Sequence, residues 1–278
     1  MTSAVPAAQF ALIGGSGTNS IDFPEQLESP DVRVLETGLV FETPFGASPP
    51  FKLLELTAAD GKRRALTCLM HGWRRGVKRG DASLQLFWVF HEAGVRKILA
   101  DGGVGSFDVE TEPRTVVLPT DYIDFTIRKD IYVRGDHLLI MRNPVCRSLH
   151  PTLLAATSSE FERVIGGGVY VCTEGPQFES AAEIRAFAHM GAQVVGQSMC
   201  PEVVLARDIG ACYARLDIVV NYAEGIVEAW SHEELSSIFR EESEKIGKAL
   251  LRTAMEAPLG DEYCDCRELR KPTLLSET

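Results

Sequence analysis

The sequence predicts an α/β fold, in which a mixed, mostly parallel and twisted sheet is flanked by helices in a single three-layer domain. The chain has 278 residues, of which 45% are hydrophobic, and this is enough for one large core. Short segments rich in β-branched residues alternate with segments of helical periodicity. No linker, repeat or low-complexity segment divides the chain. We therefore expect one domain over residues 9–257 and a C-terminal tail over 258–278.

The expected strands are short apolar segments, several of which end in Gly, Pro or a small polar residue. They span residues 9–13, 52–56, 64–70, 96–100, 115–118, 168–172, 193–196 and 211–221. The expected helices span residues 82–92, 149–164, 180–190, 201–209 and 232–255. Ser231 and Glu234 predict a capping box at the start of the last helix. The charged segment 125–147 has little periodicity, so we expect a long excursion over the surface or toward a neighbouring subunit.

Charge and hydropathy exclude two classes of function. The formal net charge is −11, whereas a protein that binds nucleic acid needs a basic surface. No apolar segment is long enough to span a bilayer, and the first nine residues do not resemble a signal peptide. The sequence therefore predicts a cytoplasmic protein with neither a nucleic acid nor a membrane as partner.

The seven cysteines do not resemble a disulfide framework. Five of them lie within apolar segments, as reduced core thiols do: Cys68, Cys146, Cys172, Cys200 and Cys212. The other two, Cys264 and Cys266, supply too few thiols for a closed tetrahedral zinc site, so we expect no metal. This pair could have a disulfide or redox role, or it could be two tail thiols with no role.

Two glycine segments follow expected strands, where an open parallel sheet places its ligands. The first contains Gly14, Gly15, Ser16 and Gly17, whose backbone N–H groups and hydroxyl suit an anion such as phosphate. The second, residues 101–106, is expected to be a loop as well. Either segment taken alone is equally typical of a turn with no ligand.

A third loop, residues 70–80, concentrates positive and titratable side chains in an otherwise acidic chain. These side chains are His71, Arg74, Arg75, Lys78 and Arg79. Arginine and lysine are natural partners of phosphate oxygens, so the loop suggests a bound anion. A solvated surface loop would have the same composition.

Polar residues also follow three later strands. Phe178 is an aromatic residue in a polar loop, suited to stacking on a heterocycle, and the adjacent Glu179 can accept a hydrogen bond from a ring N–H. Asn221 carries an amide that can both donate to and accept from a purine edge. Each of these residues is also common in turns that bind nothing.

Taken together, these segments resemble the trimeric type of nucleoside phosphorylase, a family that includes methylthioadenosine phosphorylases and 6-oxopurine nucleoside phosphorylases. The resemblance covers about residues 10–255. The matching motifs, in chain order, are Gly14-Gly15-Ser16-Gly17, Thr43-Pro44-Phe45-Gly46, His71-Gly72, Gly105-Ser106, Tyr122-Ile123-Asp124, Glu174-Gly175-Pro176, Pro201-Glu202-Val203-Val204-Leu205-Ala206 and Val220-Asn221. The resemblance implies a nucleoside phosphorylase-like fold, a homotrimer or a dimer of trimers, and no cofactor.

The family cleaves the N-glycosidic bond of a purine nucleoside with inorganic phosphate as the nucleophile, so these two molecules are the implied partners. The residues implied to hold phosphate are Ser16, His71, Ser198 and the backbone of Gly102 and Gly103. The residues implied to contact the base are Phe178, Glu179 and Asn221, and catalysis is assigned to His71, Ser198 and Asn221.

The identity of two of these residues predicts the base. Adenine-selective members have a serine at the position of Glu179 and an aspartate at the position of Asn221, whereas this pair resembles the 6-oxopurine branch. The Glu179 carboxylate can accept N1–H of hypoxanthine or guanine but would face a lone pair on N1 of adenine. We therefore expect inosine, guanosine or 5′-methylthioinosine as substrate.

The chain also departs from the family. Met70 replaces the phosphate-binding arginine of the methylthioadenosine enzymes, and Trp73 replaces an arginine of the oxopurine enzymes. Arg74 or Arg75 is expected to supply the missing cation from a shifted position. Gln197 stands where a methionine usually lies under the ribose, and it is expected to bind the sugar.

These departures leave two alternatives to phosphorolysis. One is a phosphate-independent nucleosidase or glycosyl-transferring relative that acts on an unusual purine nucleoside. The other is a non-catalytic protein that binds a nucleoside.

Overall fold

The computed structural model describes residues 4–227, 229, 231–260 and 264–273. Its centre is a mixed sheet, as predicted, but the sheet has eleven strands rather than the eight expected. The strands of this sheet are β1 (Phe10–Ile13), β2 (Val32–Leu39), β5 (Phe51–Ala58), β6 (Gly61–Cys68), β7 (Lys97–Ser106), β8 (Val116–Val117), β9 (Asp121–Asp124), β11 (Val164–Ile165), β12 (Val169–Cys172), β13 (Val194–Gly196) and β14 (Cys212–Tyr222). Of these, β2, β9 and β11 were not predicted. The main path runs β11-β8-β14-β7-β1-β6-β5-β2, and β13, β12 and β9 branch from β7.

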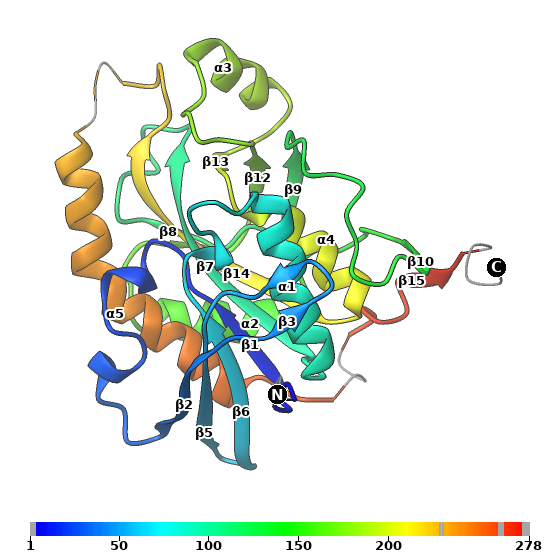
Figure 1. Cartoon of the computed structure of the whole chain (residues 1–278). Coiled ribbons are helices and arrows are strands. Elements are labelled where there is room, and N and C mark those ends of the chain that lie inside the picture. Colours follow the sequence, from blue (N-terminus) through cyan, green and yellow to red (C-terminus); the bar gives the residue numbers. More distant parts are fainter. Residues whose placement is uncertain (1–3, 228, 230, 261–263, 274–278) are drawn as a thin grey trace.

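Within the described residues, five α-helices accompany the sheet (Figure 1). They are α1 (Arg79–Glu92), α2 (Leu149–Ser158), α3 (Ala181–His189), α4 (Met199–Ile209) and α5 (His232–Glu256). Helices α2 and α5 pack on each other, α1 and α4 do the same, and β14 contacts both pairs. Ten consecutive residues of β14 are buried, which requires cover on both faces of the sheet. The three-layer α/β prediction is therefore confirmed.

The smaller elements lie at the margins of the sheet. Strands β3 (Glu42–Thr43) and β4 (Gly46–Ala47) form a short hairpin, and β10 (His137–Leu139) pairs with β15 (Arg270–Pro272) of the tail. Three short 3-10 helices are η1 (Thr18–Ser20), η2 (Glu25–Leu27) and η3 (Met70–Gly72). The excursion expected over residues 125–147 is irregular apart from β10. Within the part of the chain that is described, no helix combines the length and apolarity needed to cross a bilayer.

The second glycine segment is a strand, so the loop predicted over residues 101–106 is wrong. Strand β7 continues through it because it pairs with β14 as far as Ser106. Side chains from neighbouring elements fill the space above its glycines. A Cβ on Gly102 would lie 2.5 Å from Arg215 Nη2, and a Cβ on Gly103 would lie 2.4 Å from Phe239 Cζ. Glycine is required here by close packing rather than by a turn.

Most other boundaries lie within three residues of the prediction, but the end of one helix, the end of one strand and one helix cap differ in an instructive way. Helix α2 ends at Ser158 rather than near residue 164. Just after this end, the Ser159 hydroxyl donates to the Ala156 carbonyl and so competes with continuation of the helix. Strand β6 ends at Cys68 because the next turn takes the chain into the left-handed region. The Ser231 side chain caps α5, but the capping box with both reciprocal bonds is at Ser180, at the start of α3.

Candidate active site

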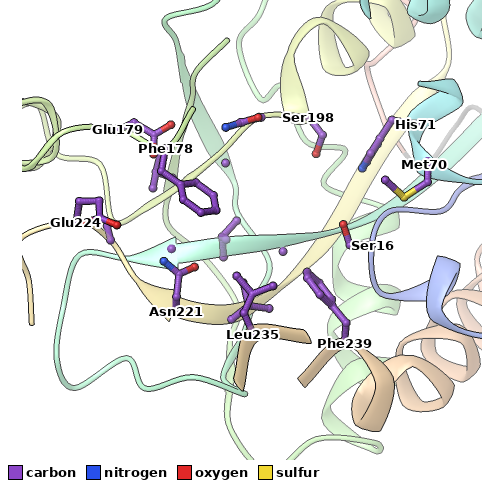
Figure 2. Close-up of a pocket in the computed structure, with 18 of the residues that line it drawn as sticks. Ser16, Met70, His71, Phe178, Glu179, Ser198, Asn221, Glu224, Leu235 and Phe239 are labelled. Atoms are coloured by element: carbon purple, nitrogen blue, oxygen red, sulfur yellow. The ribbon is translucent and has the colours of Figure 1, made fainter. Parts of the chain in front are cut away.

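A cavity of about 240 Å³ opens where β1, β6, β12, β13 and β14 end (Figure 2). The described residues that line it are Ser16, Met70, His71, Trp73, Gly103, Val104, Gly105, Phe178, Glu179, Val195, Gly196, Gln197, Ser198, Val220, Asn221, Ala223, Glu224, Leu235 and Phe239. Ser16, His71 and Ser198 lie at one end, and their polar groups converge (Figure 2). Phe178, Glu179, Asn221 and Glu224 lie at the other end (Figure 2). The fold thus brings together residues from seven separate segments of the chain.

The glycine loop after β1 is held by one buried carboxylate. Asp101 Oδ1 accepts from the Gly15 N–H at 2.8 Å, and Asp101 Oδ2 accepts from the Thr18 hydroxyl at 2.6 Å. A Cβ on Gly15 would lie 2.4 Å from the Asp101 carbonyl oxygen, so only glycine fits there. Burial raises the pKa of Asp101, against the effect of its hydrogen bond from Thr18. This arrangement fixes Ser16 at the edge of the cavity.

His71 is oriented from behind. Its Nδ1 lies 2.8 Å from Glu202 Oε1, and Glu202 Oε2 accepts from the Tyr213 hydroxyl at 2.9 Å. Because a carboxylate only accepts hydrogen bonds, Nδ1 carries a proton and the other ring nitrogen is left for the cavity. Met70 and His71 have φ values of 52° and 55°, which lie in the left-handed region that residues other than glycine rarely adopt. The ring is therefore held by both backbone geometry and a buried acid.

A buried ion pair lies behind Ser198. Arg215 Nη2 donates to Ser198 Oγ at 3.1 Å, and Arg215 Nε donates to Asp217 Oδ2 at 2.7 Å. A second bond joins Arg215 Nη2 to Asp217 Oδ1. Both side chains are fully buried, and they occupy the space left by Gly102. Gly102 therefore lies beneath the cavity and is not part of its lining. Since Ser198 Oγ accepts from Arg215, its own hydroxyl hydrogen can be donated into the cavity.

The far end of the cavity offers acceptors beside an aromatic ring. Glu179 is only 8% exposed and accepts a hydrogen bond from the Thr173 hydroxyl. Burial raises the pKa of Glu179, against the effect of that hydrogen bond. Asn221 Nδ2 donates to the Tyr222 carbonyl at 2.7 Å, which fixes the orientation of the amide. Phe178 is 52% exposed, as expected of a ring that can cover a ligand.

The lining also contains an amide and an apolar wall. The amide is that of Gln197, whose Oε1 accepts from Arg79 Nη1 at 3.1 Å and whose Nε2 donates to the Gln177 carbonyl at 3.0 Å. Leu235 and Phe239, both from α5, form the apolar wall (Figure 2). A bound molecule would therefore meet both an amide and hydrocarbon.

The structure does not bring Arg74 and Arg75 to the anion end. The Arg74 guanidinium donates to the carbonyls of Gly72 and Ala47 and to Gln85 Oε1, so its hydrogen bonds go to the protein. Arg75 is exposed and is absent from the described cavity lining. The cation nearest to Ser198 comes instead from Arg215, as described above.

Four buried charged residues that support the site were missed by sequence reasoning: Asp101, Glu202, Arg215 and Asp217. Each lies in or next to an apolar segment, and a charge inside such a segment is a signal that it has a buried partner. Glu224, a second carboxylate at the base end, was missed because it follows Asn221 in an ordinary loop.

Comparison with known proteins places the chain in a family. The family model described as "Phosphorylase superfamily" matches residues 9–254. The chain belongs to the phosphorylase superfamily. The 6-oxopurine nucleoside phosphorylase of Pyrococcus furiosus is 30% identical over 275 residues, which are 95% of this chain and 98% of that protein. The resemblance stated from the motifs is thus confirmed.

Two further superfamily members are informative. A probable S-methyl-5′-thioinosine phosphorylase of Methanopyrus kandleri is 42% identical over 144 residues, which are 51% of this chain and 56% of that protein. A methylthioadenosine phosphorylase of Schistosoma mansoni in complex with adenine has a TM-score of 0.78. That alignment covers 94% of this chain and 96% of the Schistosoma mansoni chain at 20% identity. It confirms the fold of the protein described here.

Proposed function

We propose that this superfamily member cleaves the N-glycosidic bond of a 6-oxopurine nucleoside with inorganic phosphate, giving the free base and a ribose 1-phosphate. The observation that carries the proposal is the pairing of Glu179 and Asn221 at the far end from Ser16, His71 and Ser198 within one cavity. The two ends suit the two reactants, and the space between them suits the sugar.

The base end favours a 6-oxopurine. The buried Glu179 carboxylate can accept N1–H of hypoxanthine or guanine, whereas adenine would place a lone pair against it. The Asn221 amide, fixed by its bond to the Tyr222 carbonyl, contacts the N7 edge of the ring. Phe178 covers the face of the base.

The anion end suits phosphate. Ser16 and Ser198 supply hydroxyl donors, and His71 supplies the ring nitrogen that Glu202 does not engage. Arg215 acts through Ser198 as a positioning residue: by donating to Ser198 Oγ, it directs the serine hydrogen toward the anion. This buried arginine takes over part of the role of the arginine replaced by Met70.

The chemistry follows from this arrangement. A phosphate oxygen forms a bond to C1 of the sugar while the bond from C1 to N9 of the purine breaks, and the bonding electrons leave with the base. Charge then grows on the purine, where Asn221 at N7 and Glu179 at N1–H hold the ring as it departs. His71 and Ser198 hold the phosphate on the opposite face of the sugar carbon. On this account catalysis depends on His71, Ser198 and Asn221.

The sugar region favours an apolar 5′ substituent. Leu235 and Phe239 line the cavity between the two ends, where the 5′ side of a bound nucleoside lies beside hydrocarbon. Gln197 is also in the lining, and its amide is suited to bind the sugar hydroxyls. We therefore expect 5′-methylthioinosine to react with higher kcat/KM than inosine, in keeping with the methylthioinosine phosphorylase among the relatives.

We further propose that the protein is a homotrimer in the cytoplasm that serves purine salvage. Segment 125–147 exposes apolar side chains of a kind that a neighbouring subunit would cover: Phe125 at 47%, Ile127 at 84% and Tyr132 at 54% exposure. All seven cysteines are free in the structure, which suits a reducing compartment.

The test is the release of free base from inosine and from 5′-methylthioinosine by the purified protein, with and without phosphate. The proposal predicts that release requires phosphate and that each free base is accompanied by one sugar 1-phosphate. Equal release without phosphate, with free sugar as the product, would establish the nucleosidase alternative. Binding without turnover of either nucleoside would establish the non-catalytic alternative.

A further inference from the structure

Four cysteines from three separate segments meet far from the cavity. Cys146 precedes α2, Cys212 begins β14, and Cys264 and Cys266 lie in the tail that follows α5. Their four sulfur atoms all lie within 4.8 Å of one another. We name this set the thiol cluster. Cys212 and Asn221 lie nine positions apart on one strand, so about 30 Å separates the thiol cluster from the base end of the cavity.

The spacing of the sulfurs matches a tetrahedral metal ion. Zinc bound to four thiolates at about 2.3 Å has sulfur atoms about 3.8 Å apart. In the thiol cluster, the Sγ atoms of Cys212 and Cys264 are 3.4 Å apart, and none of the six pairs exceeds 4.8 Å. Each sulfur therefore needs to move by less than about 1 Å to bind one ion. A disulfide, in contrast, joins only two of the four and does not explain why all four converge.

The surroundings of the thiol cluster favour negative charge on its sulfurs. Lys97 is only 2% exposed, and its Nζ lies 4.0 Å from Cys212 Sγ. A zinc ion with four thiolates carries a net charge of −2, which a lysine side chain at this distance stabilises.

We propose that Cys146, Cys212, Cys264 and Cys266 bind one zinc ion in a closed, structural site. Four sulfur ligands in tetrahedral arrangement select zinc among the common divalent ions, and four protein ligands leave no open position for a substrate. On binding, each thiol releases its proton to solvent and each sulfur donates an electron pair to Zn²⁺. No group is oxidised or reduced.

The consequence of the site is to fasten the tail to the domain. The described part of the tail ends in β15, which pairs with β10 (Figure 1). The zinc ion would tie two tail residues to the start of β14 and to the turn before α2. The sequence alone predicted no metal because Cys264 and Cys266 offer only two thiols. The other two ligands become visible only when the fold brings them close.

The first experiment measures metal in the full-length protein, purified without chelator and with any histidine tag removed. Metal analysis should find about one zinc ion per chain. After removal of zinc with a chelator under reducing conditions, titration with Co²⁺ should give the strong visible absorption of a tetrahedral site and the near-ultraviolet bands of sulfur–cobalt bonds. Saturation should occur at about one Co²⁺ per chain.

In a variant with both Cys264→Ser and Cys266→Ser, the zinc content per chain should fall at least about tenfold relative to the parent. The melting temperature of this variant should also be lower. Cys68→Ser changes a buried cysteine of β6 outside the thiol cluster, and it should keep the zinc of the parent. Three results would overturn the proposal: no metal with four free thiols, disulfides in place of metal, or iron as the bound ion. The cobalt titration uses the unaltered chain, so it decides the question even if the variant does not fold.

Discussion

Replacing Glu179 by glutamine tests how the base is selected. The amide has the shape of the carboxylate but no charge, and its NH₂ group can donate to N1 of adenine. Hydrogen bonds to charged groups contribute about 1.5–3 kcal/mol, so loss of the ionic acceptor for N1–H should lower kcat/KM for 6-oxopurine nucleosides by about 10- to 150-fold. The bond from the Thr173 hydroxyl to residue 179 can persist through the amide oxygen, so the fold should be retained.

The assay is kcat/KM for 5′-methylthioinosine and for 5′-methylthioadenosine at saturating phosphate. In the Glu179→Gln variant, the ratio of the two values should fall by about 10-fold or more, because only the 6-oxo substrate loses a charged partner. Glu183→Gln is the matched control: it removes one carboxylate nearby, and glutamine can keep the capping box of α3. If the ratio is unchanged in Glu179→Gln, the assignment of Glu179 to N1–H is refuted.

Three further predictions concern the anion end and pH. Ser198→Ala should raise KM for phosphate about tenfold or more with a smaller effect on KM for the nucleoside, and a change confined to the nucleoside would contradict the assignment. Arg215→Met should lower the free energy of unfolding, measured in urea, by about 3–5 kcal/mol, since Asp217 stays buried without a partner. The double variant with Asp217→Leu should regain most of this free energy. Additive effects of the two substitutions would show that the residues are not coupled. Because burial raises the pKa of Glu179, the carboxylate is lost on acidification at a higher pH than for an exposed glutamate. Below that pH, kcat/KM for 5′-methylthioinosine should fall in the parent and stay flat in Glu179→Gln.

The sign of the stability effect of Glu179 is opposite to the sign of its effect on activity. Its folded pKa lies above the ordinary value of 4.5, so the folded protein binds more protons than the unfolded chain between these two values. The contribution of Glu179 to stability therefore falls as pH rises through this interval. A carboxylate that costs stability while it serves the substrate is typical of a binding site.

Much of the cavity could be predicted from sequence because its lining follows the ends of strands. Ser16, Ser198 and Asn221 each come directly after or at the end of an apolar segment, and the carboxyl ends of parallel strands meet at one edge. The glycines of β7 misled the prediction, since close packing and a turn both require glycine. Only the structure shows that Arg215 and Phe239 fill the space above Gly102 and Gly103.

The supporting residues could not be paired from sequence. Glu202 lies 131 positions from His71, and Arg215 of β14 reaches Ser198, which precedes α4. Such pairs depend on how strands are ordered in the sheet, which local periodicity does not determine. The same reason applies to the thiol cluster, where Cys146 and Cys264 are distant in sequence.

We propose above that one cavity binds a 6-oxopurine nucleoside together with phosphate. The most direct test is a competition in one vessel, in which equal amounts of 5′-methylthioinosine and 5′-methylthioadenosine are offered with phosphate and the products are identified by mass spectrometry. We expect hypoxanthine in large excess over adenine, with 5-methylthioribose 1-phosphate equal to the total free base. Adenine in excess, or free 5-methylthioribose in place of the sugar phosphate, would contradict it.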